Sequence, residues 1–439
     1  MGIINGDFTF HPVGQGLFYS GRISCNNNNL QTNFVYDCGT KNYNEHFKNL
    51  VKEYAQSLHR KTLDMLVLSH FHEDHINGLK LLFDEGITIK KCFIPYFTPE
   101  ERFIIWASVW NELGDEEWYF NFLMDPITYL INNKVEQVII IGKGSGDSGE
   151  NEDPAPPESP DNFDNYKEKD KANADSIVNI DKLVKDDELQ RSILNNFKQW
   201  EDFVKNEKLF IRSHKGYITI SCAWYFRFFN LKDNLSNEIQ VFKDSLKKDG
   251  IDFLKLQNEP LYMKEKQKEI GECYKDAFKG KDGINMTSLT VYHSPIDEHM
   301  HHFYALLGNC YCPGCFMFYG KRHTHNHFYN YCITGQLLTG DINLNNIDNL
   351  DEFLKHYQKV LNNVFLFQLP HHGSEHNWNK KLLNVLSFCN IWVASAGLHN
   401  SYNHPSDKVF NDIEDRNRTP MLIFEYNKFN YGFKIRKIQ

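Results

Sequence analysis

The sequence predicts an α/β fold in which buried strands end in groups of metal-binding side chains. First, the apolar run 65–68 has the composition of a buried strand, and three histidines and an aspartate follow it at positions 70–75. Second, three later strands end in an aspartate, a His-His pair and an Asn/His cluster, as a site along one sheet edge requires. Third, the 439-residue chain is 41% hydrophobic and 14% aromatic, which is enough for a large core.

The N-terminal elements read as a β meander followed by a strand and a helix. Strands are predicted at 8–10, 16–23 and 32–36, with an Asn-rich turn at 26–29. The motif strand 65–68 precedes a helix over 76–83. Further strands are predicted at 91–95 and 135–141, the latter from its β-branched residues. The second half then predicts strands at 283–291, 331–338, 364–369 and 391–394.

The segment after the motif strand is the predicted reactive centre. Alternate residues of an extended chain point the same way, so His70 and His72 present two imidazoles to one point. Asp74 and His75 follow at the first turn of the helix, where a carboxylate and an imidazole suit a second cation. The pattern therefore predicts two divalent metal ions in one site. Imidazole ligands favour Zn²⁺ or Mn²⁺ over Mg²⁺.

These residues resemble the H-x-H-x-D-H signature of the metallo-β-lactamase fold. The resemblance implies an αββα sandwich with a binuclear metal site along one edge of the paired sheets. It also implies that Asp37, after the strand 34–36, braces the metal loop, and that Asp341 bridges the two metals. Many members of the superfamily place a further histidine before the strand that ends at 291. This chain has Asn285 there, which can orient water or a substrate oxygen but is a poor transition-metal ligand.

Two later motifs narrow the resemblance. They are P-H-H-G-S at 370–374 and S-x-G-x-x-N-x-Y-x-H-P at 395–405, and V-G-Q-G at 13–16 accompanies them. The chain with these motifs resembles the metallo-β-lactamase domain of the competence DNA-uptake channel ComEC and its soluble relatives. This resemblance covers residues 8–95 and 283–436. It implies that His371 or His404 completes the metal shell. It also implies that His372, Ser374 and Asn400 bind a phosphate oxygen or protonate a leaving group, and it leaves open which histidine does which.

The predicted chemistry is hydrolysis by a metal-activated water. Two cations lower the pKa of a shared water and clamp the oxygens of the group under attack. A phosphodiester carries charge that such cations and nearby imidazoles stabilise in the transition state. We therefore expect a metal-dependent phosphodiester hydrolase, in the first place a nuclease acting on DNA, with Asp74, His372 and Asn400 as catalytic residues. By resemblance to soluble members of the branch, it is an expected effector in bacterial anti-phage defence.

Two other functions fit the same motif. One is hydrolysis of small esters, lactones or choline phosphoesters at this site. The other is a partner-regulated scaffold with little activity alone. The His-His cluster at 371–372 favours phosphate, whereas the net charge of −9 and pI near 6.1 argue against a broad basic surface for long DNA. Nucleic-acid binding would then need a local groove.

The predicted hydrolase domain comprises residues 1–97 and 281–439, with 98–280 as a long, mainly helical insertion. Within it, 142–175 is rich in Gly, Ser, Pro and acidic residues and predicts a flexible loop. Residues 209–221 predict a hairpin around Lys215-Gly216. The insertion is a candidate docking surface for a regulatory protein partner.

The cysteines and the apolar runs bear on location and on a further metal. Ten irregularly spaced cysteines without a secretory signal predict reduced thiols and a cytoplasmic protein, and no run is long enough for a membrane span. A Cys-Pro-Gly-Cys turn with nearby histidines predicts either a structural zinc or a metal-free hairpin. The candidate zinc ligands are Cys310, Cys312, Cys315, His323 and His325.

Overall fold

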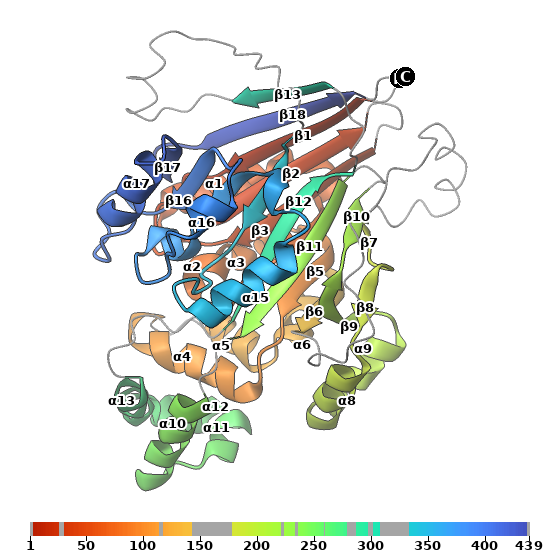
Figure 1. Cartoon of the computed structure of the whole chain (residues 1–439). Coiled ribbons are helices and arrows are strands. Elements are labelled where there is room, and N and C mark those ends of the chain that lie inside the picture. Colours follow the sequence, from red (N-terminus) through yellow and green to blue (C-terminus); the bar gives the residue numbers. More distant parts are fainter. Residues whose placement is uncertain are drawn as a thin grey trace.

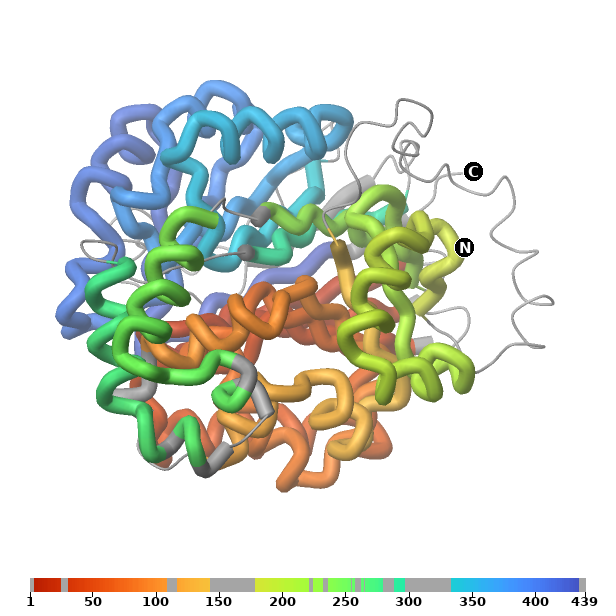
Figure 2. Tube along the Cα trace, turned by 90° about the horizontal axis from the view of Figure 1, so that it is seen from below, coloured from red at the N-terminus to blue at the C-terminus, as the bar shows by residue number. Residues whose placement is uncertain are grey.

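The computed structural model describes residues 3–25, 30–113, 117–142, 178–220, 224–232, 236–258, 260–278, 287–296, 302–307 and 333–436. In these residues the strands form two sheets, and helices lie to either side of the pair (Figure 1). Seen from below, the N-terminal part (red to orange) and the C-terminal part (cyan to blue) form the two halves of the molecule (Figure 2).

The first sheet has the strand order β13-β18-β1-β2-β3-β4-β5-β6-β9-β8. The strands β1, β2 and β3 pair antiparallel, which confirms the predicted meander. From β3 to β9 the pairing is parallel. The bounds are β1 (Ile3–Phe10), β2 (Phe18–Cys25), β3 (Leu30–Cys38), β4 (Thr62–Val67), β5 (Thr88–Pro95), β6 (Val135–Gly142), β8 (Leu183–Lys185), β9 (Leu209–Gly216), β13 (His302–Leu307) and β18 (Phe429–Arg436).

The second sheet has the order β17-β16-β15-β14-β12-β11-β10-β7. Its strands from β14 to β17 pair parallel, so their carboxyl ends meet at one edge. The bounds are β7 (Val178–Asn179), β10 (Ile218–Ile220), β11 (Trp224–Lys232), β12 (Thr287–Pro295), β14 (Gly335–Leu338), β15 (Val364–Gln368), β16 (Ile391–Ser395) and β17 (Thr419–Ile423).

The helices begin at recognisable capping residues. Asn44 accepts a hydrogen bond from the backbone N–H of Phe47 and so starts the first helix, which buries an apolar stripe. The bounds are α1 (Glu45–Ser57), α2 (Glu73–Ile76), α3 (Gly78–Asp84), α4 (Pro99–Leu113), α5 (Glu117–Met124), α6 (Pro126–Asn132), α8 (Asp187–Asn196), α9 (Glu201–Lys205), α10 (Ser236–Lys248), α11 (Phe253–Asn258), α12 (Pro260–Glu265), α13 (Gln267–Ala277), α15 (Ile347–Tyr357), α16 (Leu382–Val385) and α17 (Asp407–Glu414).

Three buried clusters define four layers. The inner cluster joins both sheets; for example, Phe34 of β3 and Phe226 of β11 lie with their ring centroids 5.0 Å apart. A second cluster packs the outer face of the first sheet against α1, α3 and α4. The third packs the outer face of the second sheet against α15, α16 and α17. The predicted αββα sandwich is therefore confirmed.

The segment 98–280 adds to both sheets as well as carrying helices. It supplies β6, β8 and β9 to the first sheet and β7, β10 and β11 to the second. The predicted hairpin at 209–221 is wrong, because β9 pairs with β6 and β8 whereas β10 pairs with β7 and β11. β9 ends at Gly216, which has φ +98° and lies so close to Lys182 that an added Cβ would be 2.1 Å from its carbonyl oxygen. The chain then crosses to the other sheet. The predicted flexible loop lies almost wholly outside the described residues.

Several other predictions fall outside the described residues. These are Asn285 and the candidate structural zinc ligands Cys310, Cys312, Cys315, His323 and His325. In the part of the chain that is described, no helix combines the length and the apolar character needed to cross a membrane.

Candidate metal centre

Parallel strands of both sheets end at the site. In the first sheet, β3 leads to Asp37 and β4 leads to the segment 69–75. In the second sheet, β14 leads to Asp341, β15 to the turn Pro370–Gly373, and β16 to the loop that carries His404. The structure thus brings together residues that lie more than 300 positions apart in the sequence.

Asp341 lies at the centre of the imidazoles. Its carboxylate oxygens are 3.6 Å from His70 Nε2, 3.3 Å from His75 Nε2 and 3.8 Å from His371 Nε2. His372 Nε2 is 4.0 Å from the same carboxylate. Contacts to histidines from both halves of the sandwich suit the bridging role that the resemblance implied for Asp341.

Two overlapping groups of side chains have the spacing of metal ligands. Within each group the ligand atoms lie within 4.8 Å of one another, and all the residues are buried. One imidazole nitrogen binds one cation, so His75, which is common to both groups, would serve one of two ions. The groups are His70, His75 and Asp341, and Asp74, His75 and His372.

Hydrogen bonds fix the orientation of His70 and His75. The Ser69 hydroxyl donates to Asp37 Oδ2 at 2.5 Å, so it must accept from His70 Nδ1 at 2.8 Å. His75 Nδ1 donates to the same carboxylate oxygen at 2.8 Å. Because both Nδ1 atoms carry a proton, both Nε2 atoms face Asp341 as the ligand positions. Asp37 therefore holds Ser69 and His75 of the segment 69–75 in place.

The histidine pair of the second sheet is oriented in the same way. His371 Nδ1 contacts Asn377 Oδ1 at 3.0 Å, and Asn377 Nδ2 donates to the carbonyl of Asp341 at 3.1 Å, so the amide oxygen is the acceptor. His372 Nδ1 donates to the carbonyl of Ser395 at 2.8 Å. The Nε2 atom of His372 then lies 3.5 Å from Asp74 Oδ2, in the position of a metal ligand.

The buried nitrogens fit a metal. The Nε2 atoms of His70, His75 and His372 are buried, and no hydrogen-bond partner satisfies them. Buried polar atoms are almost always paired, so three such nitrogens that converge on carboxylates indicate that a cation completes the site. Imidazole and carboxylate ligands suit Zn²⁺ or Mn²⁺.

Burial and charge leave Asp74, His72 and His404 in their ligand forms. Burial alone would lower the pKa of His75, but the charges of Asp341 and Asp37 raise it well above its usual range, so this imidazole gives up a proton when it binds a metal. Burial alone would raise the pKa of Asp74, but the nearby imidazole of His372 and the charges of His75 and Lys41 hold that pKa well below its usual range. Burial lowers the pKa of His72 to about 4 and, with neighbouring histidines, that of His404 to about 3. At neutral pH these two imidazoles are therefore uncharged.

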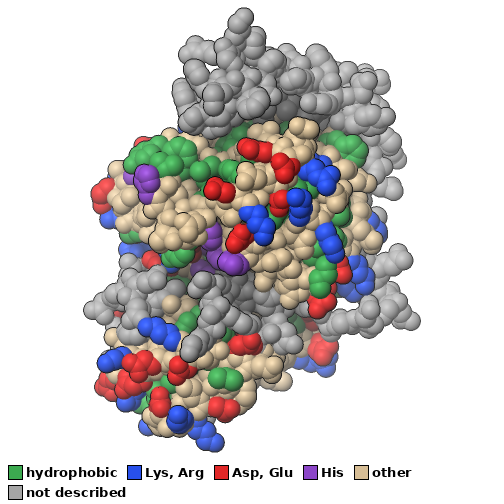
Figure 3. Space-filling view, turned by 60° about the vertical axis from the view of Figure 1, so that its left-hand side comes forward, with side chains coloured by type: hydrophobic (Ala, Val, Ile, Leu, Met, Phe, Trp, Pro, Cys, Tyr) green, Lys and Arg blue, Asp and Glu red, His purple; other side chains and the backbone are tan. Residues whose placement is uncertain are grey.

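His72 and His404 lie at the margin of the site. The His72 ring is 4.8 Å from the His70 ring, and the His404 ring is 5.2 Å from that of His371. Neither belongs to the two closely spaced groups. Both are partly exposed. Figure 3 shows histidine side chains in a hollow of the surface.

The backbone at the site adopts unusual conformations. Asp37, His371 and His372 have φ values of +56°, +48° and +57°, in the left-handed region that residues other than glycine rarely occupy. Gly340, at φ +55°, lies so close to its neighbours that an added Cβ would be 2.5 Å from Ser288 Oγ. Strained residues of this kind cluster at functional sites.

The predicted catalytic residue Asn400 holds a turn. Asn400 Nδ2 donates to the carbonyls of Gly397 and His404, and its Oδ1 accepts from the N–H groups of Tyr402 and His404. The side chain of Asn400 thus shapes the loop that presents His404.

Ser374, predicted to bind a phosphate oxygen, is buried. Its Oγ accepts a hydrogen bond from the backbone N–H of His376 at 3.3 Å, inside the turn that follows the histidine pair.

Several residues at the site were missed in the sequence. Ser69 and Lys41 adjoin the recognised motifs, so proximity in sequence could have indicated them. Asn377 had no such signal. Neither did Gln368, whose Oε1 accepts from the N–H groups of Thr339 and Gly340 and so fixes the turn before Asp341.

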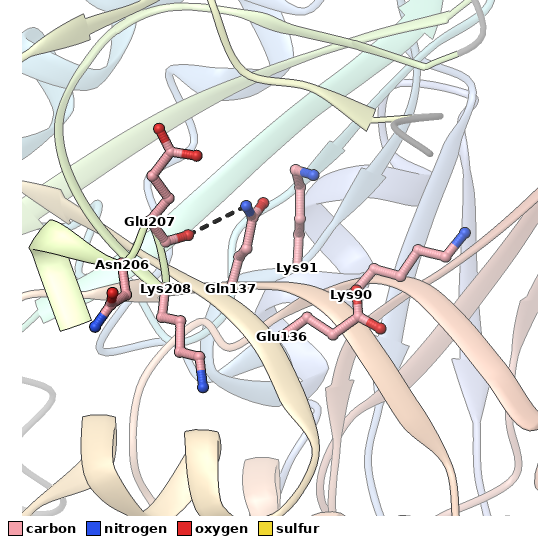
Figure 4. A pocket seen from close by; sticks show the side chains of 7 residues that line it. All are labelled: Lys90, Lys91, Glu136, Gln137, Asn206, Glu207 and Lys208. Carbon is pink, nitrogen blue, oxygen red and sulfur yellow. Dashed lines mark hydrogen bonds between the residues drawn. The ribbon is translucent and has the colours of Figure 1, made fainter. Parts of the chain in front are cut away.

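A separate surface pocket of about 410 Å³ lies at the other end of the first sheet (Figure 4). It opens near the starts of β5 and β6, whereas the metal centre follows the ends of β3 and β4. Its charges are mixed, and it contains none of the candidate ligands. Its lining residues are Lys90, Lys91, Glu136, Gln137, Asn206, Glu207 and Lys208.

Comparison with known proteins gives a family match and distant structural likenesses, of which two examples follow. The metallo-beta-lactamase fold protein YhfI from Bacillus subtilis is 8% identical, with 97% of this chain and 99% of that chain covered and a TM-score of 0.34. Unliganded yeast PDE1 is 10% identical, with the same coverage and a TM-score of 0.35. At these scores neither likeness informs the function.

A search of curated proteins gives no match. Residues 29–124 match the family model of the metallo-beta-lactamase superfamily. This segment includes Asp37 and the whole histidine motif from His70 to His75. It is therefore similar to a metallo-beta-lactamase superfamily domain, and in the structure Asp341 and His372 of the second sheet lie next to it.

Proposed function

We propose that this protein is a metal-dependent phosphodiester hydrolase, and in the first place a nuclease that acts on DNA. The observation that carries the proposal is the convergence of oriented imidazole Nε2 atoms on Asp341 and Asp74 at one sheet edge. When bound, two divalent cations supply a water of lowered pKa and a clamp for the substrate oxygens. Residues His70, His75, His372, Asp74 and Asp341 would hold them.

The charge of the site supports an anionic substrate. Two divalent cations outweigh the negative charges of Asp74 and Asp341, and the imidazole ligands are neutral when they bind metal. Lys41 adds positive charge next to Asp74. A phosphodiester, which carries one negative charge, is attracted to such a site more strongly than a neutral ester or lactone is.

The remaining residues hold the ligands in place. Asp37 and Ser69 keep His70 and His75 in the orientation in which their Nε2 atoms face Asp341 as ligand positions. His372 is positioned as a ligand of the cation at Asp74, so we assign it to metal binding rather than to proton transfer.

A regulatory partner and a role in anti-phage defence belong to the same proposal. The helices α10 to α13 pack together beside α4, which follows the carboxyl end of β5 and so lies at the same end of the first sheet as the site (Figure 1). The resemblance to soluble ComEC-like proteins suggests the biological setting. Reduced cysteines in a cytoplasmic protein agree with the buried thiols of Cys38, Cys92 and Cys389.

The test is cleavage of labelled linear and circular DNA, of RNA and of bis(4-nitrophenyl) phosphate, with Mn²⁺, Zn²⁺ or Mg²⁺ added to metal-free protein. We expect activity with Mn²⁺ or Zn²⁺ that is lost in Asp74→Asn. The matched control is Asp84→Asn, an exposed carboxylate ten residues along the chain that pairs with Lys80. Wild-type protein that binds metal and hydrolyses none of these phosphodiesters would refute the proposal.

A further inference from the structure

Exposed apolar side chains gather on loops around the metal centre. Tyr43, Leu398, Tyr402 and Tyr426 are exposed by 36%, 50%, 50% and 82%. Large apolar side chains grouped at the surface indicate a site of interaction. Three of the four are tyrosines, whose flat rings stack on nucleic-acid bases.

Glu425 ties these loops into one rim. Its Oε1 accepts a hydrogen bond from Asn42 Nδ2 at 2.9 Å, and its Oε2 accepts from the backbone N–H of Leu398 at 3.1 Å. Asn42 is next to Tyr43, and Tyr426 follows Glu425. The loops after β3, β16 and β17 are therefore joined, and we call the apolar side chains that they carry, Tyr43, Leu398, Tyr402 and Tyr426, the tyrosine rim.

The rim is continuous with the metal centre. The Tyr402 ring lies over that of His404, with centroids 5.9 Å apart and an angle of 28° between the planes. The His404 ring is 5.2 Å from that of His371, whose Nε2 is 3.8 Å from Asp341. The side chain of Asn400 accepts hydrogen bonds from the backbone of this loop, so the backbone position of Tyr402 beside the metal centre is fixed.

The rim also carries a cation. Lys41 lies at the start of the loop that leads to Asn42 and Tyr43, and its backbone N–H donates to the carbonyl of Gln15 at 2.6 Å. Its positive charge acts on Asp74 of the metal centre. A cation beside the metal ligands can contact a phosphate, while rings further out meet the bases on either side.

We propose that the tyrosine rim binds unpaired bases of single-stranded nucleic acid, with Tyr402 as the stacking surface next to the scissile phosphate. The inference rests on the proposed phosphodiesterase function and names its substrate class. In a duplex the base faces are already stacked, and binding depends on many backbone contacts. The net charge of −9 does not predict the long basic track that a duplex would need.

The test compares two substrates of equal length and charge: a single-stranded oligonucleotide and the same backbone without bases. We expect wild-type protein to show the lower KM for the oligonucleotide. In Tyr402→Ala the KM for the oligonucleotide should rise about 10-fold or more, which is typical for loss of one stacked base. The KM for the abasic backbone should stay unchanged. Tyr402→Phe keeps the ring and should behave like wild type.

The matched control is Phe388→Ala. This ring is 49% exposed but precedes β16, at the end of that strand away from the site. Its loss should leave both KM values unchanged. Wild-type protein that cleaves both substrates with equal KM would overturn the inference and leave the proposed function standing. Tighter binding of duplex than of single strand would also overturn it, as would an unchanged oligonucleotide KM in Tyr402→Ala.

Failure of the proposed function is distinguishable from these results. If wild-type protein hydrolyses neither substrate, fluorescence anisotropy of a labelled single strand still compares wild type with Tyr402→Ala. Equal affinities, or no binding by either protein, would overturn the inference. If the tyrosine rim instead binds a protein partner, neither wild type nor Tyr402→Ala should bind the labelled single strand.

Discussion

Replacing Asp37 by asparagine should weaken metal binding without unfolding the protein. The carboxylate accepts three hydrogen bonds: Oδ1 from the Ser69 N–H at 2.6 Å, and Oδ2 from Ser69 Oγ at 2.5 Å and His75 Nδ1 at 2.8 Å. Asparagine has the same shape and tolerates the φ of +56°. Its amide, however, places a donor on one of the two sides. His75 then loses the acceptor that keeps its Nε2 free of a proton.

The size of the effect follows from this change of tautomer. Loss of a carboxylate that orients a metal-binding histidine typically costs about 10- to 100-fold in metal affinity. This corresponds to about 1.4–2.7 kcal/mol of binding free energy. Competition of metal-free protein with a chromogenic chelator for Zn²⁺ or Mn²⁺ measures the dissociation constant directly.

Asp64 supplies the matched control. It is also a buried carboxylate of the first sheet, and it accepts from the Asn33 N–H at 2.9 Å and from Lys90 Nζ at 3.0 Å. Asp64→Asn should lower the free energy of unfolding while leaving metal affinity unchanged. Wild-type metal affinity in Asp37→Asn, or an equal loss in Asp64→Asn, would refute the reasoning.

Three further predictions concern stability. Gly340→Ala should lower the free energy of unfolding by about 2–4 kcal/mol, because Gly340 has a positive φ and lies in close contact with Ser288. Gly86→Ala, at φ +80° with open space around it, should lower the free energy of unfolding by only about 1–2 kcal/mol. Urea unfolding measures both values, and equal losses would contradict the role of the contact with Ser288. Burial lowers the pKa of His293 to about 3, so only the unfolded state gains a proton as the pH falls below about 6.5. The free energy of unfolding should therefore fall by roughly 2 kcal/mol more between pH 7 and pH 5 in wild type than in His293→Gln, and the same pH dependence in both proteins would exclude this role. Finally, chelation of bound metal should lower the free energy of unfolding, by about 2.7 kcal/mol if the free metal was at 100 times its Kd, and an unchanged urea midpoint would argue against a metal held by the folded state.

Sequence reasoning found the parts of the site that are local. The strand that ends before His70, and the residues that follow within one helical turn, form a pattern that neighbouring residues set by themselves. Asp341 and the pair at 371–372 were found because each follows an apolar strand that ends in polar residues. Asn377 was missed because its partners, His371 and the carbonyl of Asp341, come together only after folding.

The hairpin error has the same origin. Lys215-Gly216 between two apolar runs is a good local turn signal, and β9 does end there, at Gly216 with φ +98°. Which strand pairs with which depends on the sheets on either side. β9 completes a parallel ladder beside β6, while β10 finds its partners in β7 and β11. Of these partners, β6 and β7 lie far from the turn in sequence, so residues near the turn do not reveal them.

The placement of the ligands couples the site to the sandwich itself. His70, His75 and Asp74 follow a strand of the first sheet, and Asp341 and His372 follow strands of the second. Direct contacts cross between the sheets here, because the Leu289 N–H donates to the carbonyl of Ser69 at 2.7 Å. A cation that binds ligands from both sheets is held only when the sheets are packed together. Metal binding and closure of this edge must therefore stabilise each other, because a ligand that binds only the folded state stabilises that state.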